Sequence, residues 1–567
     1  MFQRRAGRKP DPSGQLGVYV AGGFMLLVAF AVLLGWVAAF LAGLEPTGNP
    51  FGWIVGLATG EDDWSIGASV IAVVLLAVLT AGGGLIARRV AGGRSGTGRV
   101  DHLAKEMSRQ RDIRPLSVEA ARGEAKRMGV APECGPGVPI GKAVNGAWLL
   151  ATSWEWTQLW IMGTRAGKTS CLCIPQTLAT EGPVLATSNK RDLLDLTRGP
   201  RSQHGLVRVH DPQGLAGEEP TWFWSPISYS TTAPRADEMV SLFVAATRDA
   251  DAKPDAYFDP AGQNLMKALL LAAEKGNRSI YDVYEWVRRP DDEEPELLLR
   301  EAGAHSAAID VESARTKTPK QRDGIYGSAE GLLSWLSNED LKKWLTPGEG
   351  RVEFDPDEFV RSKGTLYLLS MEGPGSARAL TAALTVAVTR AAERYGVEQG
   401  GRLRRPLLCV LDEAANVCRW PQLPDLYSHY GSRGIILAVF LQSYSQGVRV
   451  WGKDGMKTMW SAANLRGIGR GIADDEFAGT VSKLVGPMDV RTRSSSTSMK
   501  SGTSTSTQLR RDNILEVADV SAFPGGRAIV LASGVPPVLL ELQHWSTLPQ
   551  ADLIKESKDF YGEGAVA

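Results

Sequence analysis

The sequence predicts an α/β protein built on a mainly parallel sheet, with an all-α insertion and an apolar N-terminal hairpin. From about residue 147, apolar runs of strand length alternate with helical stretches, which favours a parallel sheet with helical crossovers. The section 262–345 shows helical periodicity without a clear strand. Two long uncharged runs precede residue 90. These three observations set the expected architecture.

Composition excludes several classes of protein. A chain of 567 residues with 43% apolar and 22% charged residues is typical of a globular protein of more than one domain. Lys plus Arg and Asp plus Glu balance at 63 each, so no global basic field indicates nucleic acid, although a local basic surface stays open. The five cysteines form no CxxC pair and the six histidines have no metal-ligand spacing. We therefore expect no zinc site, and reduced thiols in a cytosolic environment.

The first 90 residues predict a transmembrane anchor. The runs 16–44 and 66–86 are each long enough to cross a bilayer core of about 30 Å. Basic residues lie before the first run and after the second, and the loop between them carries acidic residues but no Lys or Arg. The positive-inside rule then places both ends in the cytoplasm. A cleaved signal peptide for the first run and a soluble helical hairpin are the alternatives.

The remaining chain divides by composition into several parts. A polar, Arg-rich cytoplasmic linker covers 91–140, and Ser494–Thr507 is so rich in Ser, Thr and Gly that we expect a mobile loop. The predicted parts are a nucleotide-binding α/β domain over 141–261 and 346–550, an inserted all-α domain over 262–345, and a C-terminal tail over 551–567 whose last dozen residues look frayed.

The segment 157–170 predicts a phosphate-binding turn. A β-prone run to residue 161 enters a Gly-containing turn, then Lys168-Thr169, then a helix. Backbone N–H groups at such a turn favour an anion, Lys168 would reach the β- and γ-phosphates, and Thr169 would hold Mg²⁺. The pattern usually has Gly where this chain has Met162, so we expect Gly163 to take up the turn. The alternative is a chance Gly-Lys-Thr sequence in an ordinary loop. The predicted phosphate-contacting residues are Gly163, Thr164, Arg165, Ala166, Gly167, Lys168, Thr169 and Ser170.

A second acidic element strengthens this interpretation. The apolar run Leu407–Leu411 is typical of a buried parallel strand and ends in Asp412 and Glu413. Ligands of open α/β sheets bind beyond the carboxyl ends of the strands. Asp412 would then reach Mg²⁺, and Glu413 would activate the attacking water as a general base. The alternative is a strand capped by a solvated acidic pair.

Two further polar residues are candidates for catalysis. Gln442 follows the apolar run Ile435–Leu441 and would sense the γ-phosphate or orient water. Arg433, in the sequence Gly-Ser-Arg433-Gly, would be an arginine finger that reaches the nucleotide of a neighbouring subunit. The alternatives are an ordinary polar residue at a strand end and an exposed arginine in a turn.

These motifs together resemble a known family. Met-Gly163-Thr-Arg-Ala-Gly-Lys168-Thr resembles the P-loop of type IV secretion coupling proteins, the TraG/TraD class of conjugative DNA-transfer ATPases. Leu411-Asp-Glu-Ala-Ala-Asn416-Val, Pro421, Ser432-Arg-Gly434 and Leu441-Gln-Ser443 are similar in order and spacing to the family's second block. Met162, and Gly163 where the family usually has Pro, depart from the pattern. The resemblance covers essentially the whole chain.

The resemblance implies a RecA-like P-loop ATPase that uses ATP and Mg²⁺ and is anchored in the bacterial plasma membrane with its ATPase domain in the cytoplasm. Such proteins assemble as homo-hexamers around a channel. They receive a relaxase-bound single DNA strand from the relaxosome and pass it to the subunits of a type IV secretion channel. By motif match, Lys168 and Thr169 bind nucleotide and Mg²⁺, Asp412 and Glu413 coordinate metal and activate water, and the helical insert touches the relaxosome.

Three other functions stay open at the level of sequence. The chain could be a membrane receptor that uses nucleotide only as an assembly switch, without motor activity. It could be a secretion ATPase for proteins alone. It could also be a chromosome-partitioning, FtsK-like DNA translocase. The substrate, the donor element and the oligomer number are not encoded in any motif that we recognise.

Overall fold

The computed structural model describes residues 30–46, 49–77, 99–248, 253, 255–373, 376–498 and 502–562. The chain separates into two compact units, Met1–Thr97 and Gly98–Ala567.

The N-terminal unit is helical where it is described. Residues 30–41 and 66–77 are helical, and α2 (Pro50–Thr59) lies between them, in the stretch expected to be a simple loop. Asn49 begins α2 by accepting a 2.7 Å hydrogen bond from the Gly52 amide, an N-cap that the sequence analysis missed. The predicted spans 16–44 and 66–86 extend into residues outside the described part. Within the described part, no helix has the length and apolar character needed to cross a membrane.

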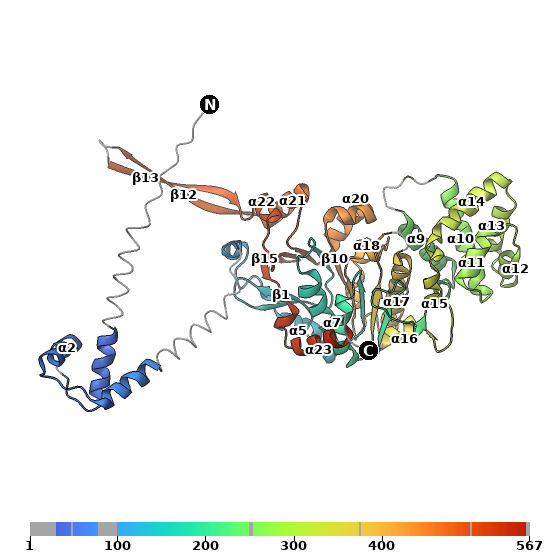
Figure 1. Ribbon diagram of the computed structural model, residues 1–567. Helices are drawn as coiled ribbons and strands as arrows, with labels where there is room; N and C mark the ends of the chain where they lie inside the picture. The colour runs from blue at the N-terminus through green and yellow to red at the C-terminus, as the bar shows by residue number, and fades with distance from the viewer. Residues whose placement is uncertain are drawn as a thin grey trace. The chain divides into compact units, whose positions relative to one another are not determined.

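The second unit is built on one eleven-stranded sheet (Figure 1). Its strand order is β2-β1-β15-β14-β11-β3-β10-β9-β4-β8-β5. Its strands are β1 (Val138–Ala143), β2 (Leu149–Thr152), β3 (Gln158–Ile161), β4 (Val184–Ser188), β5 (Val207–His210), β8 (Thr365–Leu369), β9 (Leu407–Leu411), β10 (Ile435–Leu441), β11 (Leu465–Ile468), β14 (Arg527–Ala532) and β15 (Val535–Glu541).

The strands from β11 to β5 pair in parallel, whereas β14, β15, β1 and β2 extend the sheet by antiparallel pairing. The expected α/β class with a mainly parallel sheet is therefore confirmed. The antiparallel extension was not foreseen, and it begins at Val138, before the expected start of the domain.

Both faces of the parallel strands are covered, which explains their continuous apolar sequences. Every residue of β3, β4, β8, β9 and β10 is buried. Because side chains alternate across a strand, Leu407, Cys409 and Leu411 of β9 join one core cluster while Leu408 and Val410 join the other. The rigid centre of the sheet thus holds the ends of β3, β9 and β10 in fixed positions.

Helices cover the two faces of the sheet. Apart from the cluster described below, the helices of this unit are α4 (Ala104–Met107), α5 (Val118–Arg127), α6 (Ile174–Thr177), α7 (Asp192–Ser202), α8 (Pro226–Tyr229), α9 (Ala233–Thr247), α16 (Pro356–Arg361), α17 (Arg378–Glu398), α18 (Ala414–Val417), α19 (Leu423–Leu426), α20 (Tyr444–Ala462), α21 (Asp475–Val485), α22 (Val517–Ser521) and α23 (Ala551–Tyr561). The longest, α17, buries most of its small Ala and Thr side chains, so it can lie close to the sheet.

The section between β5 and β8 contains a helical cluster. Its helices are α10 (Phe258–Lys275), α11 (Ile280–Arg288), α12 (Glu294–Glu301), α13 (His305–Arg315), α14 (Pro319–Leu332) and α15 (Lys342–Leu345). The central helix α10 contacts each of α11 to α14, and these helices gather together in Figure 1. A short parallel pair, β6 (Trp222–Phe223) and β7 (Val352–Glu353), joins the two chain segments that flank the cluster. The boundaries 262–345 for a separate domain stay a prediction.

The Ser- and Thr-rich segment does not form the mobile loop that we expected where it is described. Strands β12 (Pro487–Ser498) and β13 (Gly502–Asn513) form an antiparallel pair in which Ser494 lies opposite Ser506. The ladder supplies partners for the backbone groups, and β-branched Thr favours strands. Composition alone therefore misled the prediction over 494–498 and 502–507.

The expected frayed tail is also wrong over its described part. Residues 551–561 form α23, which packs against α7. Ile554 and Ser557 are the buried positions of α23, and Ser557 contacts Gly199 of α7. One apolar and one small side chain at this spacing give a weak sequence signal for a docked helix.

Candidate nucleotide-binding site

The candidate site lies at the carboxyl ends of β3, β10 and β9. These three strands are neighbours and run in parallel, with β10 in the middle. The turn after β3, Gln442 after β10, and Asp412 and Glu413 after β9 therefore meet at one edge of the sheet. This is the edge at which open α/β sheets bind their ligands.

The turn after β3 has the backbone shape that its sequence predicts. Arg165 and Gly167 have positive φ angles of 55° and 90°, which is easy for Gly and uncommon for Arg. After this turn the chain enters the helical segment 169–177, whose first residues form a wide π turn. The amino end of this helical segment points backbone N–H groups at the turn, which suits an anion.

Gly163 does not take up the turn as expected, since its φ is not positive. It instead allows close packing, because a Cβ at Gly163 would lie 2.8 Å from the Gly471 carbonyl oxygen. Its amide donates a 2.8 Å hydrogen bond to the Arg470 carbonyl. Met162 is fully buried, and its amide donates to the Leu441 carbonyl at 3.0 Å. The departure from the usual pattern is thus accommodated by packing against the strands beside β3.

Lys168 is a buried cation at the centre of the site. Its ammonium lies 3.2 Å from Glu413 Oε1, and only 7% of the Lys168 side chain and 9% of the Glu413 side chain are exposed. It also donates to the carbonyl oxygens of Met162 and Gly163, at 3.1 and 3.4 Å. The P-loop lysine and the second acidic element are therefore in direct contact, as one shared catalytic site requires.

Thr169 and Asp412 form the second contact between the two motifs. The Thr169 hydroxyl donates a 2.7 Å hydrogen bond to Asp412 Oδ2. Burial and the neighbouring charge of Glu413 raise the pKa of the Asp412 carboxyl to about 6, against the opposing effect of the Thr169 hydrogen bond. A hydroxyl and a carboxylate are oxygen donors of the kind that Mg²⁺ prefers. Cations near Asp412 would restore its ionised form.

Glu413 occupies an uncommon backbone conformation. Its φ of 53° and ψ of 37° place it in the left-handed region, at the start of α18. Such a conformation costs of order 1 kcal/mol or more for a residue with a Cβ, and it is concentrated at functional sites. Gln442 Nε2 donates a 2.9 Å hydrogen bond to Glu413 Oε2. The structure thus brings together Lys168, Glu413 and Gln442, as the sequence predicted.

A cavity of about 610 Å³ opens over these groups. It is lined by residues 163–170, 188–190, Asp192, Asp412, Glu413 and Gln442. All eight predicted phosphate-contacting residues line it, together with the predicted metal and water-activating residues. No group of three or more His, Cys, Asp or Glu side chains is placed to hold a metal ion in the part of the chain that is described.

A polar chain behind the site was not predicted. Gln446 Oε1 accepts from the Gln442 amide at 3.0 Å, and its Nε2 donates to Asn416 Oδ1 at 2.7 Å. Asn416 and Asn189 both donate to Glu372 Oε1, at 2.6 and 2.7 Å. These residues follow the ends of four neighbouring parallel strands. The signal in the sequence is that each of these polar residues follows a predicted strand. Predicting their contacts also needs the order of the strands in the sheet, which one sequence does not reveal.

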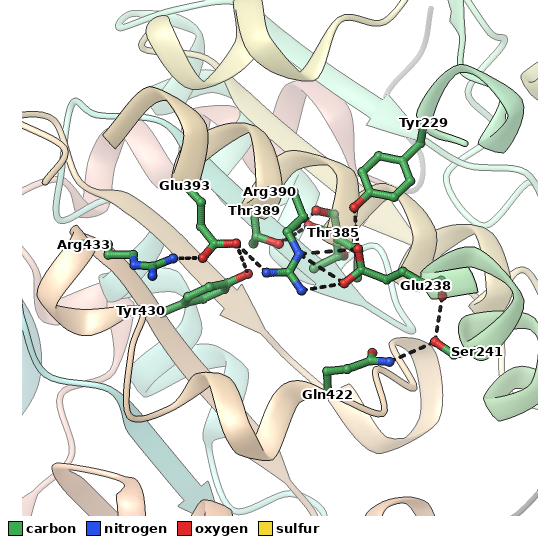
Figure 2. A network of polar contacts seen from close by, with 11 residues as sticks. Tyr229, Glu238, Ser241, Thr385, Thr389, Arg390, Glu393, Gln422, Tyr430 and Arg433 are labelled. Carbon is green, nitrogen blue, oxygen red and sulfur yellow. Dashed lines mark hydrogen bonds and ion pairs between the residues drawn. The ribbon is translucent and has the colours of Figure 1, made fainter. Parts of the chain in front are cut away.

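Arg433 lies elsewhere. It precedes β10, whereas Gln442 follows β10, so the two are separated by the strand's length of roughly 20 Å. Figure 2 shows the Arg433 guanidinium directed at Glu393 of α17, with which it forms an ion pair. The structure therefore does not bring Arg433 to the nucleotide site of its own chain. A role at a neighbouring subunit's site stays a prediction.

Comparisons with known proteins agree with this geometry. Residues 406–525, which contain β9, β10 and their acidic and polar ends, match the family described as the TraM recognition site of TraD and TraG. The chain is 23% identical over 399 residues to Protein VirD4 of Rhizobium radiobacter, and 23% identical over 392 residues to Protein VirD4 of Agrobacterium fabrum. These matches cover 68% and 66% of this chain. They span 56% and 57% of the two relatives, so the chain matches little more than half of their length.

Solved structures of the bacterial conjugative coupling protein TrwB share the fold. The unbound form has a TM-score of 0.53 at 16% identity, with coverage of 76% of this chain and 94% of that one. The form in complex with a non-hydrolysable ATP analogue has a TM-score of 0.52 at 16% identity, with coverage of 74% and 92%. The chain is thus similar in sequence to type IV coupling proteins of the TraG/TraD class, and its α/β fold is similar to that of the TrwB structures. These matches support the resemblance that the motifs predicted.

Proposed function

We propose that this coupling-protein relative is a P-loop ATPase that binds ATP with Mg²⁺ and couples hydrolysis to substrate transfer through a type IV secretion channel. The observation that carries the proposal is the 3.2 Å contact between Lys168 Nζ and Glu413 Oε1, beside the Thr169–Asp412 hydrogen bond. Two motifs 243 residues apart thus meet in one cavity. A TrwB structure with an ATP analogue and one with ADP and Mg²⁺ support the choice of nucleotide and metal.

The residues of the site divide the chemistry between them. Lys168 and the N–H groups of the turn bind the phosphate tail, and the buried ammonium then exchanges Glu413 for phosphate oxygens. Thr169 and Asp412 would hold Mg²⁺, which would supply positive charge to neutralise the phosphates. Glu413, released from Lys168 and held by Gln442, accepts a proton from the attacking water. The left-handed backbone at Glu413 fixes the direction of its carboxylate before the nucleotide enters.

We also propose the partners that the family resemblance implies. Sequence similarity over 406–525 to a TraM recognition site supports contact with relaxosome proteins. The similarity to VirD4 supports delivery of a relaxase-bound single DNA strand, or a protein, to a type IV secretion channel. Assembly as a homo-hexamer would bring Arg433 of one chain to its neighbour's nucleotide.

The apolar runs 16–44 and 66–86 are the basis for proposing a membrane anchor with both ends in the cytoplasm of a bacterial cell. This topology can be tested by labelling intact cells with a membrane-impermeant maleimide. The variant Glu61→Cys should react from outside, and Arg94→Cys should react only after the cells are opened. Labelling of both positions, or of neither, in intact cells would contradict the topology.

The enzymatic proposal is tested by ATP hydrolysis of the full-length chain in detergent, with and without single-stranded DNA. Lys168→Ala should abolish hydrolysis, because it removes the buried ammonium that lies beside Glu413 at the phosphate turn. Lys483→Ala is the matched control, since Lys483 is exposed on α21 and does not line the cavity, and it should hydrolyse ATP like the wild type. Equal rates for wild type and Lys168→Ala would reject the enzyme.

A transfer assay separates a motor from a nucleotide switch. A motor whose Glu413→Gln variant cannot hydrolyse ATP should fail to transfer DNA from a donor cell. Transfer that persists in this variant would instead identify a receptor that needs only bound nucleotide. Loss of transfer without a cell-division defect would separate this function from chromosome partitioning.

A further inference from the structure

A second cavity adjoins the nucleotide cavity. Its volume is about 630 Å³, and it shares Thr169, Ser170 and Asp192 with the cavity over the phosphate turn. The remaining wall comes from α7 and from the C-terminal part of the chain, including Trp545 of a short helical turn and Lys558 and Asp559 of α23. The sequence analysis assigned no role to these C-terminal residues.

The shared residues fix the direction in which a bound nucleotide would extend. Asp412, Glu413 and Gln442 line only the first cavity, so that cavity holds the end of the phosphate chain that is cleaved. Thr169 and Ser170, at the other end of the turn, open into the second cavity. A nucleoside triphosphate with its terminal phosphate beside Glu413 therefore carries its nucleoside past Ser170 into the second cavity.

The C-terminal wall of this cavity is built into the fold. The Ser557 hydroxyl donates a 2.6 Å hydrogen bond to the Asp195 carbonyl and accepts one of 2.9 Å from the Gly199 amide. A Cβ at Gly199 would lie 2.9 Å from Ser557 Cβ, so Gly permits this close approach of α23 to α7. Arg191 donates to the Tyr561 carbonyl, and the Arg198 guanidinium lies 4.5 Å from the centre of the Tyr561 ring. Contacts along α7 thus hold α23 beside the phosphate turn.

The chemistry of the second cavity suits a base and a ribose. Trp545, Ile174 and Leu196 supply apolar surface, and the indole offers a flat face for stacking. The rest of the lining is mostly polar, with the charged side chains of Arg191, Asp192, Asp195, Lys558 and Asp559 able to bind hydroxyl and amino groups. An apolar surface beside such polar groups can hold a base and orient a ribose.

We propose that the cavity between the phosphate turn, α7 and α23 receives the nucleoside of the bound nucleotide, with Trp545 as the stacking surface for the base. This inference deepens the proposed function and rests on it. The C-terminal helix, which its contacts with α7 already hold in place, then completes the nucleotide site.

Photolabelling of the wild-type protein tests the inference without any substitution. The full-length chain is irradiated with 8-azidoadenosine triphosphate and Mg²⁺, and the labelled peptides are mapped by mass spectrometry. The label should lie in residues 543–562 or beside Ile174, and excess ATP should prevent it. If excess ATP prevents the labelling but the label lies only in other parts of the chain, the nucleoside site alone is overturned. No protected label, with no ATP binding, would overturn the proposed function as well.

Two ligands separate the nucleoside site from the phosphate site. Trp545→Ala should weaken ATP binding about tenfold, which is about 1.4 kcal/mol, and should leave the binding of inorganic tripolyphosphate unchanged. Trp545→Phe should restore most of the ATP affinity because it keeps an aromatic face. Lys168→Ala should weaken the binding of both ATP and tripolyphosphate.

Lys558→Ala should weaken ATP binding about threefold. Lys555→Ala is the matched control, because Lys555 is an exposed lysine of the same helix that does not line the cavity. It should change the affinity for neither ligand. Unchanged ATP affinity in Trp545→Ala, or an equal loss for ATP and tripolyphosphate, would overturn the inference. Thermal melting checks that each variant is folded. If Trp545→Ala is unfolded, the Lys558→Ala pair and the photolabelling decide the question.

Discussion

Two charged clusters of this protein use similar residues in different ways. At the nucleotide site, the ammonium of Lys168 pairs with Glu413, and the adjacent carboxylate of Asp412 accepts a hydrogen bond from the Thr169 hydroxyl. Figure 2 shows the other cluster, in which the guanidinium of Arg390 on α17 lies between Glu238 and Glu393. Both clusters are largely buried, but only the nucleotide site is arranged so that its cation can exchange a carboxylate for a phosphate.

The clusters differ in how many cations face their carboxylates. Glu238 accepts from Arg390 and from the Tyr229 hydroxyl, and Glu393 accepts from Arg390, Tyr430 and Arg433. Burial alone would lower the pKa of Arg390, but its hydrogen bonds to these carboxylates raise that pKa above the usual value. This cluster therefore stabilises the contact between α9 and α17.

The nucleotide site has the opposite balance. Two adjacent carboxylates share one ammonium, and burial together with the charge of Glu413 raises the pKa of Asp412 to about 6. The backbone of Glu413 is held in the left-handed region. A shortage of positive charge and a constrained backbone are what a site for a metal ion and a phosphate chain needs. The comparison teaches that a deficit of cations relative to carboxylates, and not a lack of hydrogen bonds, separates the functional cluster from the structural one.

The largest expected effect is the loss of hydrolysis in Glu413→Gln. The amide cannot accept the proton of the attacking water, so the rate should fall about a thousandfold. ATP binding should persist, because Lys168 and Thr169 are unchanged. Steady-state hydrolysis and equilibrium binding measure the two quantities. Glu476→Gln, at an exposed glutamate of α21, is the control. A fall of less than tenfold would show that Glu413 does not activate water.

The second effect concerns the structural cluster. Arg390→Ala leaves Glu238 and Glu393 without their shared cation, so the free energy of unfolding should fall by about 3 kcal/mol. Arg394→Ala is the matched control on the same helix. It removes a single, partly exposed ion pair with Asp357 and should cost less than about 1 kcal/mol. Urea unfolding measures both variants. Equal losses would show that the cluster is no more than a set of surface ion pairs.

The third effect is a gain of stability in Asp412→Asn without nucleotide. The raised pKa means that the Asp412 carboxyl binds its proton more tightly in the folded state than in the unfolded state. Stability therefore falls as pH rises from about 4 to 6, and the cost of the buried charge is complete above pH 6. Removing the charge should stabilise the protein by about 2 kcal/mol at pH 8. The gain should shrink toward pH 4.

Urea unfolding at pH 8 and at pH 4.5 checks this prediction, and hydrolysis in the presence of Mg²⁺ should be lost in the same variant. A variant that is less stable than the wild type at pH 8 would show that Asp412 is a satisfied structural carboxylate, like those of the Arg390 cluster.

The smallest effect is expected for Arg433→Ala in the dilute chain. Arg433 is 44% exposed and pairs with Glu393, which keeps Arg390 and Tyr430 as partners. Stability should fall by less than about 1 kcal/mol, and ATP affinity should not change. If Arg433 is an arginine finger, the rate of hydrolysis per chain in Arg433→Ala should fall below that of the wild type only at high concentrations. These are the concentrations at which the wild-type chains assemble and their rate per chain rises. A weakened ATP affinity in the dilute variant would place Arg433 in its own chain's site.

The parts of the structure that follow from local sequence were predictable. The run 407–411 is apolar without alternation, and it is a strand buried on both faces. Lys168-Thr169 after a Gly turn and the Asp412-Glu413 pair meet as expected. Such sites can be predicted because parallel strands must deliver their carboxyl ends to one edge.

The missed features depend on long-range pairing. Asn416, Gln446 and Glu372 form one chain only because their strands are neighbours. The strand pairing of Ser494 with Ser506 and the docking of Ser557 on Gly199 each need a partner distant in sequence. Because these residues are not apolar, hydrophobic periodicity gave no local signal for any of these contacts. Arg433 was predicted to be an arginine finger from the order of the motifs, which does not reveal the strand end at which a residue lies.

A structure of the chain with a non-hydrolysable ATP analogue and Mg²⁺ tests the central claim most directly. We predict that Lys168 Nζ leaves Glu413 for the phosphate oxygens, that Thr169 and Asp412 lie at the metal, and that Glu413 keeps its hydrogen bond from Gln442. Nucleotide bound at another place, with the Lys168–Glu413 contact still intact, would contradict the account.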